Sequence, residues 1–440
     1  MDILIKALQF FLSLSILVVI HELGHFLFAR LFKIKVEKFY LFFNPWFSLF
    51  KIKRGDTEYG MGWLPLGGYV KIAGMIDESM DKEQMKQPPK PYEFRSKPAW
   101  QRLIVMVGGV FFNVVLAALI YVVMLFSMGD EYLPVENLRY GIVAESLGKE
   151  IGLETGDHIV AINGEKPDDW MSMLHNFARG DVYEVTVRRN SDLKQLQVPE
   201  DFFGKLIAAR GMDFVSIRFP FIVDGFLPES AAREAGVQVG DHIKGIGGED
   251  TWSFIEFART IGDYAGQQTS ITIERNGETF DLDISIPGQA MVGAYRKDPF
   301  EILSTEVREY GLLSAIPAGI SKAYSTTRNY FRDLGLLFKP EVNARESLGG
   351  FITIGGVFSP TWDWMHFWTM TAFLSIILAV MNILPIPALD GGHVMFLFYE
   401  IIVGRKPPEK FMEYAQMVGM FLLLALILLV NLNDILRLFR

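Results

Sequence analysis

Two histidines and a glutamate stand close together near the start of the chain, in His21-Glu22-Leu23-Gly24-His25. His21 and His25 are four residues apart, so on a helix both imidazoles project from one face and can bind a single ion. Zinc suits two imidazoles, one oxygen ligand and an open position for water. Glu22 would reach that water rather than the ion, where a carboxylate can accept a proton and later return it. The motif therefore predicts Zn²⁺ as a cofactor, with Glu22 as the acid/base.

The surroundings of the motif support this prediction. Residues 3–32 are mostly apolar, and a charged side chain in a membrane-spanning helix costs roughly 2.5–3.5 kcal/mol on insertion scales. Three ionisable groups within five residues therefore need an explanation, which a bound ion and its water would provide. The alternatives are a polar cluster at a helix end and histidines that are satisfied inside a protein core.

A third metal ligand is needed, and no Glu or His with suitable spacing follows in the same apolar stretch. The strong candidate is Asp390, which lies in the run 382–393, directly after a later apolar stretch. Pro385 and Pro387 in this run remove helix hydrogen bonds and break the helix. Broken helix at membrane depth is tolerated where the backbone lines a cavity. We expect Asp390 to complete a His-His-Asp site; an interfacial aspartate that caps a helix is the alternative.

Several further polar residues have two interpretations. Asn382 can donate a hydrogen bond to a substrate carbonyl and stabilise an oxyanion, or it can cap the broken backbone. Asn113 lies in an apolar stretch after Gly108 and Gly109, which permit close helix packing, and we favour a structural role for it. The other histidines are weaker candidates for ligands, because they belong to a repeat, lie far from any such group or would close the water position: His158, His242, His175, His366 and His393.

Four stretches of the chain are apolar enough to cross a bilayer, which takes about 20 residues of helix. Half of the 440 residues are hydrophobic and 36 are Phe, a composition that is unusual for a soluble protein. A cleaved signal peptide is disfavoured for the first stretch, because the apolar run is too long and no small-residue cleavage site follows. The chain has no cysteine, which excludes disulfides, and its net charge of -9 argues against a nucleic-acid partner. We expect an α-helical polytopic protein with four transmembrane helices in a lipid bilayer.

Basic residues indicate the orientation of these helices, because loops that face the cytoplasm are enriched in Lys and Arg. They gather after the first stretch and before the second and fourth stretches: Arg30, Lys33, Lys35, Lys38, Lys51, Lys53, Arg54, Lys71, Arg95, Lys97, Arg102, Arg405, Lys406 and Lys410. With an even number of spans, both termini and the large middle segment then lie outside, although Arg437 and Arg440 oppose this slightly. His25 is close to the first basic loop, so we expect the site toward the cytoplasmic side.

A glycine-rich segment, Glu58–Ile72, lies between the first two apolar stretches. Its pattern predicts a β-hairpin. The segment is too apolar for a plain solvent loop. It forms either a small cytoplasmic sheet or a re-entrant β-hairpin that dips toward the site in the membrane.

The middle of the chain contains an internal repeat. Residues 152–165 recur as residues 236–249 with the shared pattern G-x-x-x-G-D-H-I-x-x-I-x-G-E, and Trp170 and Trp252 follow the two copies. The pattern resembles bacterial PDZ domains, so we expect two of these in tandem outside the cytoplasm. PDZ folds bind peptides by adding a strand to a sheet edge. Whether these two bind a ligand or only pack as spacers stays open at this stage.

These patterns divide the chain into segments. We expect a first transmembrane helix that carries the two histidines (1–32), a cytoplasmic or re-entrant β region (33–102), a second transmembrane helix (103–128), two PDZ-like domains (129–220 and 221–288), an extracytoplasmic connector with amphipathic helices (289–365), a third transmembrane helix that carries Asp390 (366–402) and a fourth (411–437).

The combination of motifs resembles the site-2 protease family of intramembrane zinc metalloproteases over essentially the whole chain. The resemblance rests on H-E-L-G-H in the first span, L-P-L-G-G-Y after it, the two PDZ-like copies and N-x-x-P-x-P-x-L-D-G-G in the third span. It implies an enzyme of the bacterial inner membrane that cuts single-spanning membrane proteins within the membrane. The substrates implied are an anti-sigma factor already trimmed outside, whose cleavage activates a stress response, and remnant signal peptides.

The resemblance also implies roles for individual residues. His21, His25 and Asp390 would be zinc ligands and Glu22 the catalytic acid/base. The substrate site would be formed by residues of two segments: Asn382, Pro385, Pro387, Gly67, Gly68 and Tyr69. The β region would pair with an unwound substrate, and the PDZ pair, on the periplasmic side with both termini, would exclude substrates with bulky outer domains.

Two other functions fit the sequence less well. A non-enzymatic membrane scaffold would leave His21, Glu22, His25 and Asp390 without a role. A metal transporter fits poorly with a glutamate beside the histidine pair and with two PDZ-like copies. The sequence does not predict an oligomeric state.

Overall fold

The computed structural model describes the chain apart from residues 1, 76–86, 210–212, 341, 344–347 and 439–440. The chain divides into two compact units, which are described separately here. The first unit combines Met1–Gly129, Glu309–Lys339 and Asn343–Arg440, and the second combines Asp130–Arg308 and Pro340–Val342.

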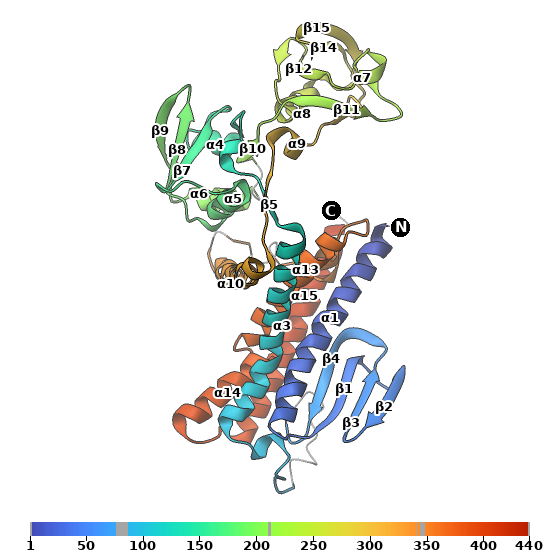
Figure 1. Ribbon diagram of the computed structural model, residues 1–440, viewed down its shortest axis with the longest axis vertical. Coiled ribbons are helices and arrows are strands. Elements are labelled where there is room, and N and C mark those ends of the chain that lie inside the picture. The colour runs from blue at the N-terminus through green and yellow to red at the C-terminus, as the bar shows by residue number, and fades with distance from the viewer. Residues whose placement is uncertain (1, 76–86, 210–212, 341, 344–347, 439–440) are drawn as a thin grey trace. The chain divides into compact units, whose positions relative to one another are not determined.

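Long helices dominate the first unit, and four of those in the described part of the chain are long and apolar enough to cross a membrane. Three of them, α1, α3 and α13, pack against one another (Figure 1). Gly24 and Gly108 allow α1 and α3 to approach closely, because a side chain at either position would collide with backbone of the other helix. The predicted polytopic membrane architecture is confirmed at this level. The four helices are α1 (Asp2–Leu31), α3 (Ala99–Met128), α13 (Trp364–Ile383) and α15 (Glu409–Leu438).

The third apolar stretch is interrupted. Helix α13 ends at Ile383, two residues before Pro385, and a new helix, α14 (Asp390–Val403), begins after the irregular segment 384–389. Helix α14 packs against α3, and Arg102 of α3 forms an ion pair with Glu400 of α14. The break therefore leaves both halves attached to the same neighbouring helix.

Two further helices of the first unit precede α13. Helix α10 (Leu312–Leu336) packs against α3, and α12 (Phe351–Gly356) packs against α15. Residues 351–356 are helical although the segment 348–356 is rich in glycine. Side chains of α15 stabilise the start of α12: Asp434 accepts a hydrogen bond from the Thr353 N–H (2.9 Å), and Asn431 accepts one from the Phe351 N–H (3.1 Å).

A four-stranded sheet lies beside α1, with the strand order β2-β3-β1-β4. The hairpin predicted over Glu58–Ile72 is wrong, because β1 lies between β3 and β4 and pairs with both of them. It runs parallel to β3 and antiparallel to β4. The true hairpin is β2-β3, whose turn at Gly55 has a positive φ of 63°. The strands are β1 (Val36–Phe43), β2 (Phe50–Arg54), β3 (Thr57–Met61) and β4 (Leu64–Ile72).

The second unit contains two copies of one strand-and-helix pattern, each with its own hydrophobic core. Each copy opens with a strand and later contains a strand, a helix and two antiparallel strands in this order. A short strand at the end of each copy pairs with the opening strand. The elements of the first copy are β6 (Ile142–Ala144), α4 (Ser146–Glu150), β7 (His158–Ile162), α5 (Trp170–Arg179), β8 (Glu184–Arg189), β9 (Asp192–Gln197), α6 (Phe202–Ala208) and β10 (Val215–Ile217).

The second copy forms a six-stranded sheet. Its elements are β11 (Phe221–Phe226), α7 (Ala231–Glu234), β12 (His242–Ile246), β13 (Glu249–Asp250), α8 (Phe254–Thr260), β14 (Gln268–Arg275), β15 (Glu278–Ser285) and β16 (Ala294–Arg296). Outside the copies, β5 (Asp130–Tyr132) pairs with β17 (Glu306–Arg308), and α9 (Pro299–Leu303) precedes β17.

The sequence repeat corresponds to a repeated ion pair. The aspartate of the G-D motif is buried in both copies and directly precedes a strand. It accepts hydrogen bonds from the arginine that ends the strand paired with that one. In the first copy Arg189 Nη2 lies 2.7 Å from Asp157 Oδ2, and in the second Arg275 Nη2 lies 2.6 Å from Asp241 Oδ2. This shared ion pair explains why the aspartate recurs in the sequence.

Candidate metal centre

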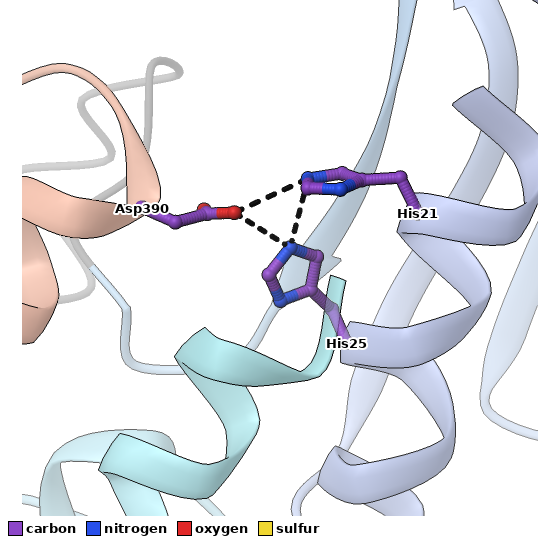
Figure 2. A group of neighbouring side chains, drawn as sticks. All are labelled: His21, His25 and Asp390. Carbon is purple, nitrogen blue, oxygen red and sulfur yellow. Dashed lines mark hydrogen bonds and ion pairs between the residues drawn. The ribbon is translucent and has the colours of Figure 1, made fainter. Parts of the chain in front are cut away.

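His21, His25 and Asp390 converge on one point of the first unit (Figure 2). The Nε2 atoms of the two imidazoles lie 3.3 Å apart. Oδ2 of Asp390 lies 3.2 Å from each of these nitrogens. Both histidines are buried, with 8% and 7% of their surface exposed. Three potential ligand atoms therefore form a nearly equilateral triangle inside the protein.

The triangle has the size that a tetrahedral zinc ion requires. Ligands held at about 2.0–2.1 Å in tetrahedral geometry are separated from one another by about 3.3–3.4 Å. His25 Nδ1 lies 2.8 Å from the carbonyl oxygen of Val105, which can only accept, so this nitrogen donates its proton there. Nε2 of the neutral ring then directs a lone pair at the Asp390 carboxylate. Without a cation the lone pairs and the carboxylate would repel, so these residues fit a bound divalent ion.

Local backbone structure places each ligand. The two histidines occupy successive turns of one face of α1. Asp390 is the first residue of α14, after the segment that contains Pro385 and Pro387. Turns formed by Ile386 O with Leu389 N (3.0 Å) and Leu389 O with Gly392 N (3.0 Å) redirect the chain. The interruption of the helix thus directs a carboxylate from a distant part of the sequence at α1.

Helix α3 lines the site with three residues spaced four apart, a contribution that the sequence analysis did not assign. Val105 accepts the hydrogen bond from His25. Gly109 leaves room for the rings, because a Cβ there would lie 2.5 Å from His25 Nε2 and 2.6 Å from His21 Cε1. Asn113 is fully buried and its Nδ2 lies 3.2 Å from His21 Nδ1. The available sequence signal was the spacing of Gly109 and Asn113, one helical turn apart in an apolar span.

Glu22 is half-buried between the candidate ligands and the sheet. A Cβ at Gly68 of β4 would lie 2.6 Å from Val18 Cγ1 and 3.7 Å from Glu22 Cγ, so the backbone of β4 lies directly against this part of α1. The neighbouring residue Gly67 faces the ring of Phe43. The sheet therefore reaches the depth of the candidate ligands.

The other residues expected at a substrate site occupy two places. Tyr69 stacks on Tyr40 and Phe43 within the sheet, and its hydroxyl donates to Asn44 Oδ1 at 2.9 Å. Asn382 lies half-buried in the last turn of α13, and its side chain makes no hydrogen bond to any other residue that the structure describes. Pro387 is packed against α15, with its carbonyl oxygen directed at Gly419. The structure thus brings together the ligands, while Asn382 and Tyr69 remain on neighbouring elements.

Comparison with known proteins places the chain in a family. The profile of peptidase family M50 matches residues 9–426, almost the whole chain. The chain belongs to peptidase family M50. The resemblance to site-2 proteases inferred from the motifs is confirmed, and this M50 peptidase is a membrane metalloprotease of the site-2 type.

Relatives of this M50 peptidase align with it from end to end. The regulator of sigma E protease of Haemophilus influenzae is 29% identical over 456 residues, which cover 98% of each chain. The regulator of sigma-E protease RseP of Escherichia coli is 29% identical over 453 residues, with 98% of each chain covered. A Vibrio cholerae relative, 27% identical over 99% of this chain and 100% of its own, has a name that describes it as a zinc metalloprotease.

Proposed function

We propose that this M50 peptidase is a zinc-dependent intramembrane protease that hydrolyses peptide bonds within the transmembrane segments of single-spanning membrane proteins. The observation that carries the proposal is the triangle of Nε2, Nε2 and Oδ2 atoms, with edges of 3.2–3.3 Å, whose two histidines lie on a helix apolar enough to span a membrane. An ionisable cluster of this kind inside a bilayer is costly unless it serves a function.

His21, His25 and Asp390 would bind the zinc ion through these three atoms. Zinc in such a site supplies Lewis acidity and lowers the pKa of a water molecule enough for attack at neutral pH. With only three protein ligands, such a site would leave room for a water molecule, as catalytic zinc sites do. His393, three residues after Asp390, does not belong to the cluster; its Nε2 lies 3.0 Å from Gln416 Nε2.

Glu22 would move the proton. Its carboxylate, adjacent to His21, accepts the proton of the attacking water and then donates it to the nitrogen of the leaving amine. Asn382 would donate its amide N–H to the carbonyl oxygen of the scissile bond as negative charge develops there. Pro385 and Pro387 would shape the wall of the substrate site by holding the segment before Asp390 out of a helix.

Strand β4 would hold the substrate. It forms one edge of the four-stranded sheet, with β1 as its neighbour in the sheet. Gly67, Gly68 and Tyr69 lie in this strand, and Gly68 adjoins Glu22. A transmembrane helix hides its peptide bonds in its own hydrogen bonds and must unwind before hydrolysis. An edge strand beside the site offers replacement hydrogen-bond partners to the unwound segment.

The second unit would control access. We propose that its two copies are PDZ domains on the periplasmic side of the bacterial inner membrane, with both chain termini on that side and the active site toward the cytoplasm. The segments proposed from the sequence are kept, except that the second domain extends beyond residue 288 to β16 (Ala294–Arg296), which pairs with β11. The repeated ion pairs, Asp157 with Arg189 and Asp241 with Arg275, support a common domain type. The pair would exclude substrates with bulky outer domains, so an anti-sigma factor trimmed outside would be accepted, and remnant signal peptides as well.

The test is cleavage by the purified full-length protein in detergent. The substrate is a single-spanning anti-sigma factor without its outer domain, and the variant is Glu22→Gln. We expect the variant to retain one zinc ion per chain and to lose cleavage. Glu37→Gln makes the same chemical change in β1, where the residue pairs with Lys71, and should cleave normally. Normal cleavage by Glu22→Gln would refute the mechanism, and wild-type protein without zinc would refute the metal site.

A further inference from the structure

Asn113 is the most deeply buried polar side chain beside the candidate metal ligands, with 0% of its surface exposed. Its Nδ2 lies 3.2 Å from His21 Nδ1. Its Oδ1 is buried as well and has no hydrogen-bond partner among the residues that the structure describes. A buried amide whose oxygen has no hydrogen-bond partner, and whose nitrogen lies next to a ring nitrogen, needs an explanation, because buried polar atoms are almost always hydrogen-bonded.

The tautomer of His21 decides which amide atom of Asn113 faces the ring. If Nε2 of His21 faces the metal with its lone pair, the neutral ring carries its proton on Nδ1. Nδ1–H cannot bond to the amide N–H₂ of Asn113, since both groups are donors. The oxygen and nitrogen of an amide exchange places by a half-turn and are assigned from their partners. The opposite orientation places Oδ1 next to Nδ1, where it accepts the ring proton. The amide N–H₂ then takes the position that Oδ1 holds in the structure, which has no hydrogen-bond partner among the described residues.

We propose that Asn113 is a positioning residue that accepts a hydrogen bond from His21 Nδ1–H through Oδ1. It holds the tautomer and the ring orientation that present Nε2 to the metal. The inference rests on the zinc site proposed above. Partners of this type orient metal-bound histidines and raise their basicity as ligands.

His25 supports this proposal because it has the same arrangement. Its Nδ1 donates to the carbonyl oxygen of Val105 at 2.8 Å. Val105 and Asn113 are eight residues apart and lie on one face of α3, with Gly109 between them. Helix α3 thus supplies one acceptor to each imidazole.

Asn113 is itself held in place by α13. Ser375 Oγ donates to the backbone carbonyl oxygen of Asn113 at 2.8 Å, and both residues are buried. This bond fixes the turn of α3 that carries the amide. The orientation of His21 therefore depends on the packing of α1, α3 and α13 together, and not on α1 alone.

A purely structural role for Asn113 is the competing explanation, and a matched variant separates the two. Asn113→Leu removes the acceptor at similar volume, and Asn113→Asp keeps an acceptor for Nδ1–H. Thr371→Val is the control, because Thr371 is a fully buried residue whose hydroxyl donates across helices to Ser13 Oγ at 3.0 Å. All three are made in the full-length protein.

The measurements are the zinc dissociation constant from competition with a chelator and the visible spectrum of the Co²⁺-loaded protein. We expect Asn113→Leu to weaken zinc binding by about 10–100-fold and to change the Co²⁺ spectrum, as loss of such a partner does elsewhere. Asn113→Asp should bind zinc within a few-fold of wild type. Thr371→Val should lower the thermal unfolding temperature without changing zinc affinity.

The proposal is overturned if Asn113→Leu binds zinc as tightly as wild type, or if Asn113→Asp binds as weakly as Asn113→Leu. Should the variants fail to fold, ¹H–¹⁵N spectra of histidine-labelled wild type with zinc give the answer directly. They must show a proton on Nδ1 of His21, and a proton on Nε2 overturns the proposal. Wild type that binds no zinc refutes the proposed function instead, so the two failures are distinguishable.

Discussion

Replacement of Gly109 by alanine tests the geometry of the site most directly. The added Cβ would lie 2.5 Å from His25 Nε2 and 2.6 Å from His21 Cε1. Ordinary van der Waals contact begins near 3.4 Å, so each ring must retreat by about 0.8–0.9 Å, or α3 must move away. Movement of α3 is opposed by its close contact with α1 at Gly24 and by the hydrogen bond from His25 to Val105.

A displacement of this size is several times larger than a metal site tolerates. Ligand distances in metal sites are held to about 0.2 Å. The triangle of ligand atoms would open or tilt, since both histidines are moved while Asp390 is not. We expect Gly109→Ala to weaken zinc binding by at least about 100-fold, which corresponds to about 2.8 kcal/mol at 1.4 kcal/mol for each factor of ten. Cleavage should be lost in parallel at zinc concentrations that saturate wild type.

The assay combines chelator competition with thermal unfolding of the metal-free protein. Gly335→Ala is the matched control, because Gly335 is an exposed residue of α10 with no atom near its missing Cβ. That variant should keep its zinc affinity. It should also gain stability, because alanine favours a helix over glycine by about 0.8–1.0 kcal/mol. If Gly109→Ala also gained stability and bound zinc normally, the rings would not lie against α3 and the account of the site would be wrong.

Two further predictions concern other parts of the chain. A side chain at Gly419 of α15 would collide with the Pro387 carbonyl oxygen, so Gly419→Ala should destabilise the protein by about 1–3 kcal/mol in thermal unfolding, as overpacking does. The control is Gly356→Ala, which adds its methyl group in open space and should not destabilise the protein. Equal stability of the two variants would contradict the contact between Gly419 and Pro387. His242 is partly buried in the second copy, with Nε2 2.8 Å from the Trp252 carbonyl oxygen, and burial lowers its pKa below the ordinary value of about 6.5. The unfolded chain therefore binds this proton first, so stability present above about pH 6.5 is lost as the pH falls toward the lowered folded value. Hydrogen exchange of β12 in the full-length protein should speed up at pH 5.5 relative to pH 7.5, after correction for intrinsic rates, and His242→Asn should remove this difference; an unchanged difference would refute the assignment.

The membrane helices and the family could be predicted from the sequence because their signals are local. A run of about 20 apolar residues forms a helix in a bilayer whatever its neighbours are. The pattern H-E-x-x-H places two imidazoles on one helix face by the helical period alone. The interruption before Asp390 was equally local, since proline at 385 and 387 cannot continue a helix.

The order of strands could not be predicted in the same way. The segment 58–72 has the composition of a hairpin, and its two strands do form, as β3 and β4. They are separated by β1, whose Tyr40 lies opposite Gly60 on one side and Tyr69 on the other. Pairing across a sheet is a long-range choice, which depends on which strand covers the apolar face of its neighbour. Helix α12 depends on distant residues in a similar way, because the groups that cap it, Asn431 and Asp434, come from α15.

The sequence by itself indicated the chemical types at the candidate site: two imidazoles, two carboxylates and the amide of Asn382, each with a role expected from its local pattern. The tertiary structure alone decided their geometry. Only the fold places Asp390 3.2 Å from both imidazoles, inserts Gly109 beneath them and brings Asn113 to His21. The physical reason is that a ligand triangle and its hydrogen-bond acceptors are set by the packing of α1, α3 and α14 to a few tenths of an ångström. No periodicity within one helix encodes distances between helices.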